Sequence, residues 1–196
     1  VLLLETKAKN QRGEAKVETL CHLAELHEDR LADASKAQLR FEEALAVEPR
    51  HLGALKGLER LYARVGKYQE LLLNLRTQIE LSATPRQRIA LLERIGGIQE
   101  EEFVDHEKAA ATFEEVIAID PGHDASNAAL ARLYRQLHRF DDLALTLDRH
   151  AKGSDDDKRK LELLSQAVKV LMVDVGAPDR ALVMCERILA LDPAHG

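Results

Sequence analysis

Apolar residues recur every three to four positions along this chain, and short polar stretches separate the recurrences. This spacing is typical of paired amphipathic helices. Within residues 14–50, one stripe consists of Val17, Leu20, Leu23, Ala24 and Leu31. The next consists of Ala37, Phe41, Ala44, Leu45 and either Leu39 or Val47. The segment Asp33-Ala34-Ser35 between them predicts a turn with an N-cap, and Pro49 predicts the end of the second helix.

Residues 51–84 predict a second helical hairpin of the same kind. Its first stripe is Leu55, Leu58, Leu61 and Tyr62. After a turn at Val65-Gly66-Lys67, its second stripe is Tyr68, Leu71, Leu72, Leu75 and Ile79. Equivalent apolar residues occur 72 positions later at Leu130, Leu133, Tyr134, Phe140, Leu143 and Leu147. The chain is therefore expected to consist of repeated helical hairpins.

A 72-residue period links three segments, 36–51, 108–123 and 180–195. Five columns are identical in all three: Ala37/Ala109/Ala181, Glu42/Glu114/Glu186, Ala46/Ala118/Ala190, Pro49/Pro121/Pro193 and His51/His123/His195. A fixed period predicts a solenoid, in which each unit buries its apolar face against its neighbours. The predicted hairpins span 14–50, 51–84, 86–122, 123–153 and 156–193. Residues 1–12 are expected to end a preceding hairpin, which makes the chain part of a longer array.

The second helix of each odd-numbered hairpin carries a recurring pattern, shown by Ala37, Phe41, Ala44 and Pro49. It resembles the second-helix signature of the tetratricopeptide repeat, and Leu92, Ile95 and Gly96 resemble part of the family's first-helix segment. Cys185 departs from the pattern, because it replaces the aromatic residue in the last copy. The resemblance implies an all-α, right-handed superhelix of about five hairpins that binds other proteins.

Composition supports helices and limits the classes of partner. Of the 196 residues, 45% are hydrophobic, 32% are charged and 4% are aromatic, and tryptophan is absent. With a net charge of −6 and no basic stripe, nucleic acid is not an expected partner. No apolar run reaches the roughly 20 residues of a membrane span, so membrane insertion is not expected. A cytoplasmic location is favoured, but the start at Val1 without methionine leaves localisation open.

Charge alternates between hairpins on the first helices, which by resemblance line the concave face. Acidic residues come first, at Glu18, Glu25, Glu28 and Asp29, followed by basic residues at Lys56, Arg60 and Arg64. The next two hairpins repeat the change of sign, with Glu93, Glu100 and Glu101 followed by Arg132 and Arg135. One interpretation is a groove that selects a peptide of complementary charge. The other interpretation, which we favour, is that charges on neighbouring helices pair with one another as weak surface ion pairs.

Catalytic and metal sites are not expected. The recurring histidines lie a full period apart, too far for shared ligation, so His51, His123 and His195 are predicted to serve turns or helix caps. Cys21 and Cys185 occupy apolar helix positions and are predicted to be inert core thiols without a mutual disulfide. No phosphate loop, nucleophile elbow or zinc-protease motif is present, and no cofactor is implied.

These observations predict a non-catalytic scaffold that binds a protein or peptide partner. Two alternatives remain open. The array could act as a structural spacer or assemble with further copies through exposed ends, or it could be a helper domain of an enzyme.

Overall fold

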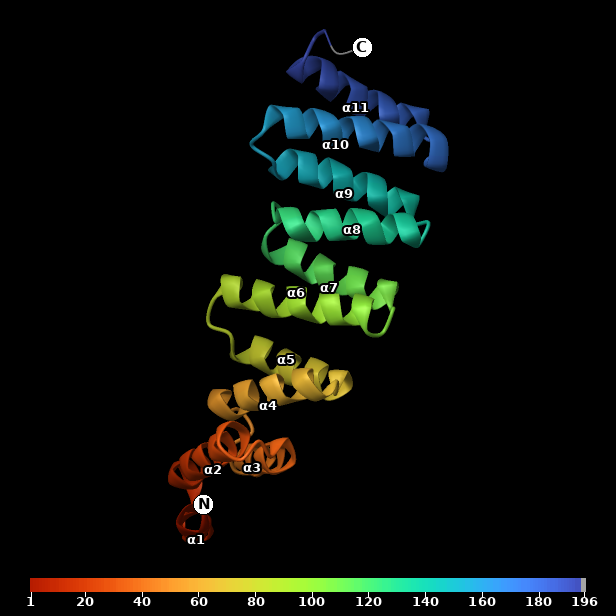
Figure 1. Ribbon diagram of the computed structural model, residues 1–196. Helices are drawn as coiled ribbons and strands as arrows, with labels where there is room; N and C mark the ends of the chain where they lie inside the picture. Colours follow the sequence, from red (N-terminus) through yellow and green to blue (C-terminus); the bar gives the residue numbers. More distant parts are fainter. Residues whose placement is uncertain (195–196) are drawn as a thin grey trace. The chain divides into compact units, whose positions relative to one another are not determined.

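The chain is all-α, and the computed structural model describes residues 1–194. Within that range it forms eleven α-helices and one π-helical turn, and no strand (Figure 1). The residues divide into two compact units, Val1–Gln87 and the chain from Arg88 onward. The predicted fold class of consecutive helical hairpins is thereby confirmed.

The first unit holds five complete helices and the first turn of a sixth. These are α1 (Leu2–Asn10), α2 (Gly13–Asp29), α3 (Ala34–Val47), α4 (Leu52–Val65), α5 (Tyr68–Leu81) and the start of α6 (Pro85–Glu101). Helix α2 packs against α3, and α4 packs against both α3 and α5. Leu23, Phe41, Leu58, Leu61 and Leu75 are fully buried in this core.

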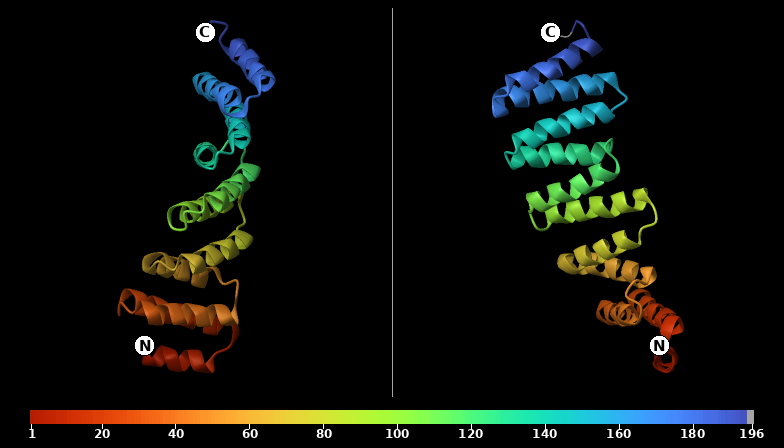
Figure 2. Two further views of the ribbon diagram at one scale, coloured as in Figure 1. Left: turned by 90° about the vertical axis from the view of Figure 1, so that its right-hand side faces the viewer. Right: turned by 180° about the vertical axis from the view of Figure 1, so that it is seen from behind.

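The second unit continues α6 and repeats the hairpin arrangement. It adds α7 (His106–Ile119), α8 (Asp124–Gln136), α9 (Phe140–Gly153), α10 (Asp157–Val170), the π-helical turn η1 (Leu171–Val175) and α11 (Pro178–Leu191). Consecutive helices from α7 to α11 run antiparallel, as the right-hand view of Figure 2 shows. One hydrophobic core joins these helices, and it includes Phe113, Leu130, Leu147, Leu164 and Ile188.

Helix starts follow the sequence prediction closely. Asp33 caps α3 by accepting a hydrogen bond of 3.0 Å from the Lys36 backbone N–H, and Asp105 caps α7 from Lys108 in the same way. The histidines cap helices too: Nδ1 of His51 accepts from the Ala54 N–H at 3.2 Å, and His123 caps α8. The capping role is confirmed at these two positions. The third histidine, His195, lies outside the described residues.

Left-handed turns also recur at the 72-residue period. Ala32, Val104 and Gly176 occupy equivalent positions between paired helices, with φ of 50°, 52° and 72°. Gly66 and His138 form a second equivalent pair, with φ of 72° and 56°. Only glycine adopts this conformation without steric cost, and a β-branched residue such as Val104 is the least suited to it. Equivalent turns thus keep the same backbone conformation, even where the side chain makes that conformation unfavourable.

The aromatic residue of the repeat packs against small residues. A Cβ placed on Gly57 of α4 would lie 2.3 Å from the ring of Phe41, and one placed on Gly96 of α6 would lie 2.8 Å from the ring of Phe113. Both rings therefore need a neighbouring helix that carries no side chain at the contact point. In the third copy Cys185 replaces the ring.

Three predicted core positions are wrong. Leu31 is 53% exposed because α2 ends at Asp29, two residues before it. Leu39 and Val47 of α3 are also exposed, so neither alternative extends the buried stripe of that helix. The stripe consists of Ala37, Phe41 and Ala44 instead.

Candidate protein-interaction surfaces

In the first unit, the predicted charges of α2 and α4 converge on one carboxylate. Glu28 of α2 accepts a hydrogen bond from Arg60 of α4 at 3.2 Å and forms an ion pair with Arg64 at 3.3 Å. The Glu28 side chain is only 8% exposed, whereas both arginine side chains stay more than half exposed. The two arginines therefore cover the carboxylate, and they keep surface available on their outer side.

The same pair recurs in the second unit between α6 and α8. Arg132 contacts Glu100 with two guanidinium nitrogens, an arrangement that favours the charged form of both groups. The hydrogen bond from Arg132 lowers the pKa of Glu100, and the same bond raises the pKa of Arg132. Since Glu28/Glu100 and Arg60/Arg132 are each 72 residues apart, the repeat carries this ion pair as part of its pattern.

Other predicted site residues are less engaged. Within residues 1–194, the side chains of Asp29, Lys56 and Arg135 are exposed and have no hydrogen-bond or ion-pair partner. Glu25 lies 3.9 Å from His22 of its own helix, and Glu93 lies 3.8 Å from His123. The structure thus joins five of the ten predicted residues, three in the cluster around Glu28 and two in the Glu100–Arg132 pair, and leaves the others facing solvent or a weak neighbour.

A tyrosine–glutamate pair is a second recurring contact, and the sequence pattern did not reveal it. The Tyr62 hydroxyl donates to Glu42 at 3.3 Å, and Tyr134 donates to Glu114 at 3.0 Å. Burial, together with the glutamate, raises the pKa of Tyr62 to about 12 and raises the pKa of Tyr134 as well. The sequence did carry a signal for this contact, because the glutamate and the tyrosine are 20 residues apart in both copies.

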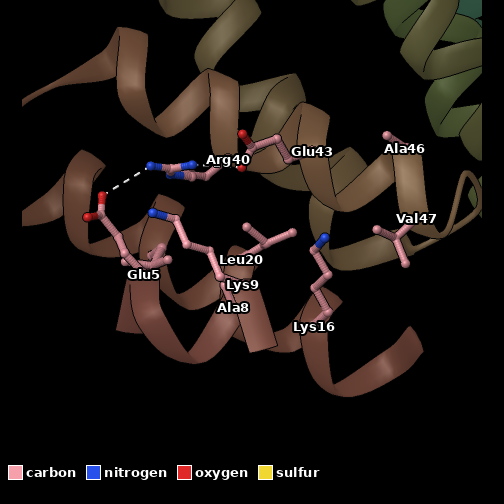
Figure 3. A pocket seen from close by; sticks show the side chains of 10 residues that line it. Glu5, Ala8, Lys9, Lys16, Leu20, Arg40, Glu43, Ala46 and Val47 are labelled. Carbon is pink, nitrogen blue, oxygen red and sulfur yellow. Dashed lines mark hydrogen bonds and ion pairs between the residues drawn. The ribbon is translucent and has the colours of Figure 1, made fainter. Parts of the chain in front are cut away.

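Grooves at the edges of the hairpins are the other feature that sequence analysis missed. The larger one, of about 400 Å³, lies between α1, α2 and α3; we call it the Lys16 groove, and it is lined among others by Ala8, Lys9, Lys16, Leu20, Leu23 and Ala46 (Figure 3). A second one, of about 270 Å³, lies between α9, α10 and α11; we call it the Lys160 groove, and it is lined by residues that include Lys152, Lys160, Leu164, Arg187 and Ala190.

The two grooves are equivalent under the 72-residue period. Lys16 corresponds to Lys160, Leu20 to Leu164 and Ala46 to Ala190. In the sequence, each groove is marked by a lysine four positions before a leucine, Lys16 before Leu20 and Lys160 before Leu164. Arg88 and Leu92 have the same spacing. A helical stripe alone does not distinguish a groove wall from a packed contact, so this spacing could not be interpreted without the fold.

The histidines and cysteines within residues 1–194 do not gather into a candidate metal site. No group of three or more histidine, cysteine or acidic side chains that could hold a metal ion occurs in the part of the chain that the structure describes. The cysteines are half-buried free thiols, which is less burial than the prediction of core thiols requires. Burial raises the pKa of the Cys21 thiol to about 11, so this thiol stays protonated near neutral pH.

Among the described residues, no helix has both the length and the apolar character needed to cross a membrane.

The fold is similar to solved structures of repeat proteins. A tetratricopeptide repeat protein from Parabacteroides merdae matches with a TM-score of 0.50 and 17% identity, covering 89% of this chain and 79% of that chain. A double mutant of MamA RS-1 matches with a TM-score of 0.50 and 14% identity, covering 94% of this chain and 98% of that chain. No family model and no curated protein matches the sequence. The chain therefore has the tetratricopeptide-repeat fold.

Proposed function

We propose that this chain, given its tetratricopeptide-repeat fold, is a non-catalytic scaffold that binds a segment of a partner protein. Within each unit, the binding surface is the face formed by the first helices of its hairpins: α2 and α4 in the first unit, and α6 and α8 in the second. A fold of repeated hairpins forms an extended surface rather than an enclosed active-site pocket, so it suits binding better than catalysis.

The observation that carries the proposal is the difference in exposure within the recurring ion pair. Glu28 and Glu100 are largely covered, but Arg60 and Arg132 are about half exposed. A guanidinium held in place by one carboxylate keeps further donors for a second one, and its side chain has already lost conformational freedom. Lys56 beside Arg60, and Arg135 beside Arg132, add unpaired positive charge to the same helices.

These contacts favour a partner segment with acidic side chains. Charge of this kind contributes to specificity and association rate more than to affinity. The remaining binding energy would come from aliphatic contacts, because the recurring tyrosines donate to glutamates inside the hairpins.

The proposal can be tested with random 16-residue peptides displayed on phage and selected on the full chain. Lys56→Glu and Arg135→Glu change unpaired charges, so the melting temperature should stay within about 2 °C of the original while acidic peptides lose binding. Retained binding of every selected peptide by both variants would contradict the proposal. Glu18→Gln on α2 serves as a control for a first-helix change that adds no charge reversal.

Self-assembly is a second candidate, and one observation favours it. Helix α11 exposes Leu182, Val183 and Leu189 on its surface. Scattered apolar residues are ordinary, but several on one helix form a patch that a second copy could cover. Light scattering of the chain and of a Leu182→Glu/Leu189→Glu variant separates the two: only self-assembly through α11 predicts a larger mass that the variant abolishes.

A further inference from the structure

We propose that the Lys16 groove is a second binding site, which takes a partner-protein segment with an aliphatic side chain flanked by two carboxylates. The groove lies where α1, α2 and α3 meet, at a different place from the first-helix surface. The proposal therefore does not depend on the function proposed above.

The floor of the groove is apolar and has room for a side chain. Leu20 and Leu23 of α2 form it, and the small residues Ala8 and Ala46 leave the space above it open. A volume of about 400 Å³ lies within the range of pockets that hold small ligands or a few side chains. An aliphatic side chain in this space would be removed from water on most sides, which is where apolar burial contributes to binding.

The walls of the groove supply two available cations. Arg40 is already bound to Glu5 at 3.1 Å and to Glu43 at 2.8 Å, so its charge is compensated within the chain. By contrast, Lys9 and Lys16 have no hydrogen-bond or ion-pair partner among residues 1–194. Three cations and two carboxylates line the groove, which leaves one net positive charge.

The positions of the two lysines determine the kind of segment that fits. In Figure 3, the Lys9 ammonium lies toward the end where Glu5 meets Arg40, and the Lys16 ammonium lies toward Val47, with Leu20 between them. A single terminal carboxylate would reach one ammonium and leave the other unmatched. Two acidic side chains on either side of an aliphatic residue match both.

The second unit shows which chemistry these cations accept. In the equivalent Lys160 groove, Lys160 binds Asp157 at 2.8 Å and Lys152 binds Asp148 at 2.7 Å. Asp148 also binds Arg187 from α11. Lys160, the equivalent of Lys16, is therefore paired with a carboxylate of the chain, whereas Lys16 has no such partner among residues 1–194. Lys9 has no equivalent lysine, because the period places Gly153 at its position.

The experiment is a selection of random 12-residue peptides, blocked at both ends, on the full chain at low salt. Peptides with an aliphatic residue between two acidic residues should be enriched. The best of them is then titrated by fluorescence anisotropy against the original chain and against Lys9→Glu/Lys16→Glu, which should weaken binding by about tenfold or more because two attractive pairs become repulsive. Amide replacement of both acidic residues in the peptide should weaken binding similarly.

Two controls keep the result specific. Lys152→Glu/Lys160→Glu changes the equivalent groove, where the lysines are already paired, and should leave the anisotropy titration unchanged. Ala46→Phe fills the Lys16 groove without altering charge and should abolish binding while circular dichroism stays the same. Selection of no such peptide, or equal binding to the Lys9→Glu/Lys16→Glu variant, would overturn the proposal. Loss of binding on Lys56→Glu instead would assign these peptides to the first-helix surface.

Discussion

Helices α2 to α5 of the first unit and α6 to α9 of the second are equivalent under the 72-residue period. Three of the four helix pairs begin and end at equivalent residues, and α4 extends only one residue further than α8. The side chains that serve these positions differ, however. The Gln99 side chain accepts a hydrogen bond from Thr112, whereas at the equivalent place both ring nitrogens of buried His27 have no hydrogen-bond partner among residues 1–194.

This comparison shows that the repeat preserves backbone and helix ends more strictly than side-chain contacts. Helix length depends on caps and turns, which are local and repeat with the sequence. A side-chain pair depends on two residues from different helices, so a change at either one removes it. The differences between equivalent positions therefore predict where the two units will respond differently to mutation.

The largest difference is expected at the aromatic position. Phe41→Ala and Phe113→Ala should each destabilise the chain by about 3–5 kcal/mol, because each removes a buried ring from a packed contact. Cys185→Ala, at the equivalent place in the third copy, should cost about 1 kcal/mol or less, since it removes one atom from a half-buried side chain. Urea denaturation followed by circular dichroism measures all three. Equal losses would show that the third copy packs as the first two do.

A smaller effect is expected where glycines face the rings. Gly57→Ala should destabilise by about 1–3 kcal/mol, because its Cβ would overlap the Phe41 ring. Gly97→Ala is the matched control: its Cβ would meet nothing within 4 Å, so the higher helix propensity of alanine should stabilise α6 by about 0.5–1 kcal/mol. Thermal denaturation should show shifts of opposite sign, and shifts of the same sign would contradict the packing described for Phe41.

The left-handed turns predict a change of about 1 kcal/mol. Val104→Gly should stabilise the chain by about 0.5–1 kcal/mol, since a β-branched residue at a φ of 52° is unfavourable. Gly176→Val makes the reverse change at the equivalent turn and should destabilise by about 1–2 kcal/mol. Ala32→Gly should stabilise the chain slightly, so its denaturation midpoint should lie between those of the other two variants. The order of the three denaturation midpoints tests the equivalence of the turns.

The smallest effect concerns the recurring ion pair, and it depends on pH. Arg132→Gln should cost up to about 1 kcal/mol at pH 7, because Glu100 loses its partner at a partly exposed site. The pKa of Glu100 is lowered in the folded chain, so this stabilisation is present above the ordinary carboxyl pKa and disappears as pH falls through the lowered value. Arg135→Gln, which removes an unpaired charge, should show no such pH dependence. Denaturation at pH 7 and pH 3 compares the two variants.

Much of the fold could be predicted from local sequence. Asp33, His51 and Pro49 mark helix ends through short-range hydrogen bonds and backbone restriction, and the structure agrees with them. Leu31 was misplaced because an apolar residue just beyond a helix continues the stripe in sequence while the backbone has already turned.

The candidate surfaces were only partly predictable. The sequence indicated that charges alternate along the first helices, but it left open whether Arg60 and Arg132 bind a partner or a neighbouring helix. The contacts to Glu28 and Glu100 come from residues 32 positions away, and such a separation has meaning only after two helices are placed side by side. The Lys16 groove, which three helices form together, left no pattern that could be interpreted in advance.

The sequence by itself determined that the chain is helical, that its hairpins recur every 72 residues, and where most helices begin and end. These properties depend on hydrogen bonds and steric limits within a few residues, and the repeated side chains impose them in each copy. Only the tertiary structure decided which charges are paired, which lysines remain available and where small residues leave open space. Those outcomes depend on the distances between side chains of separate helices, which packing fixes and local sequence does not.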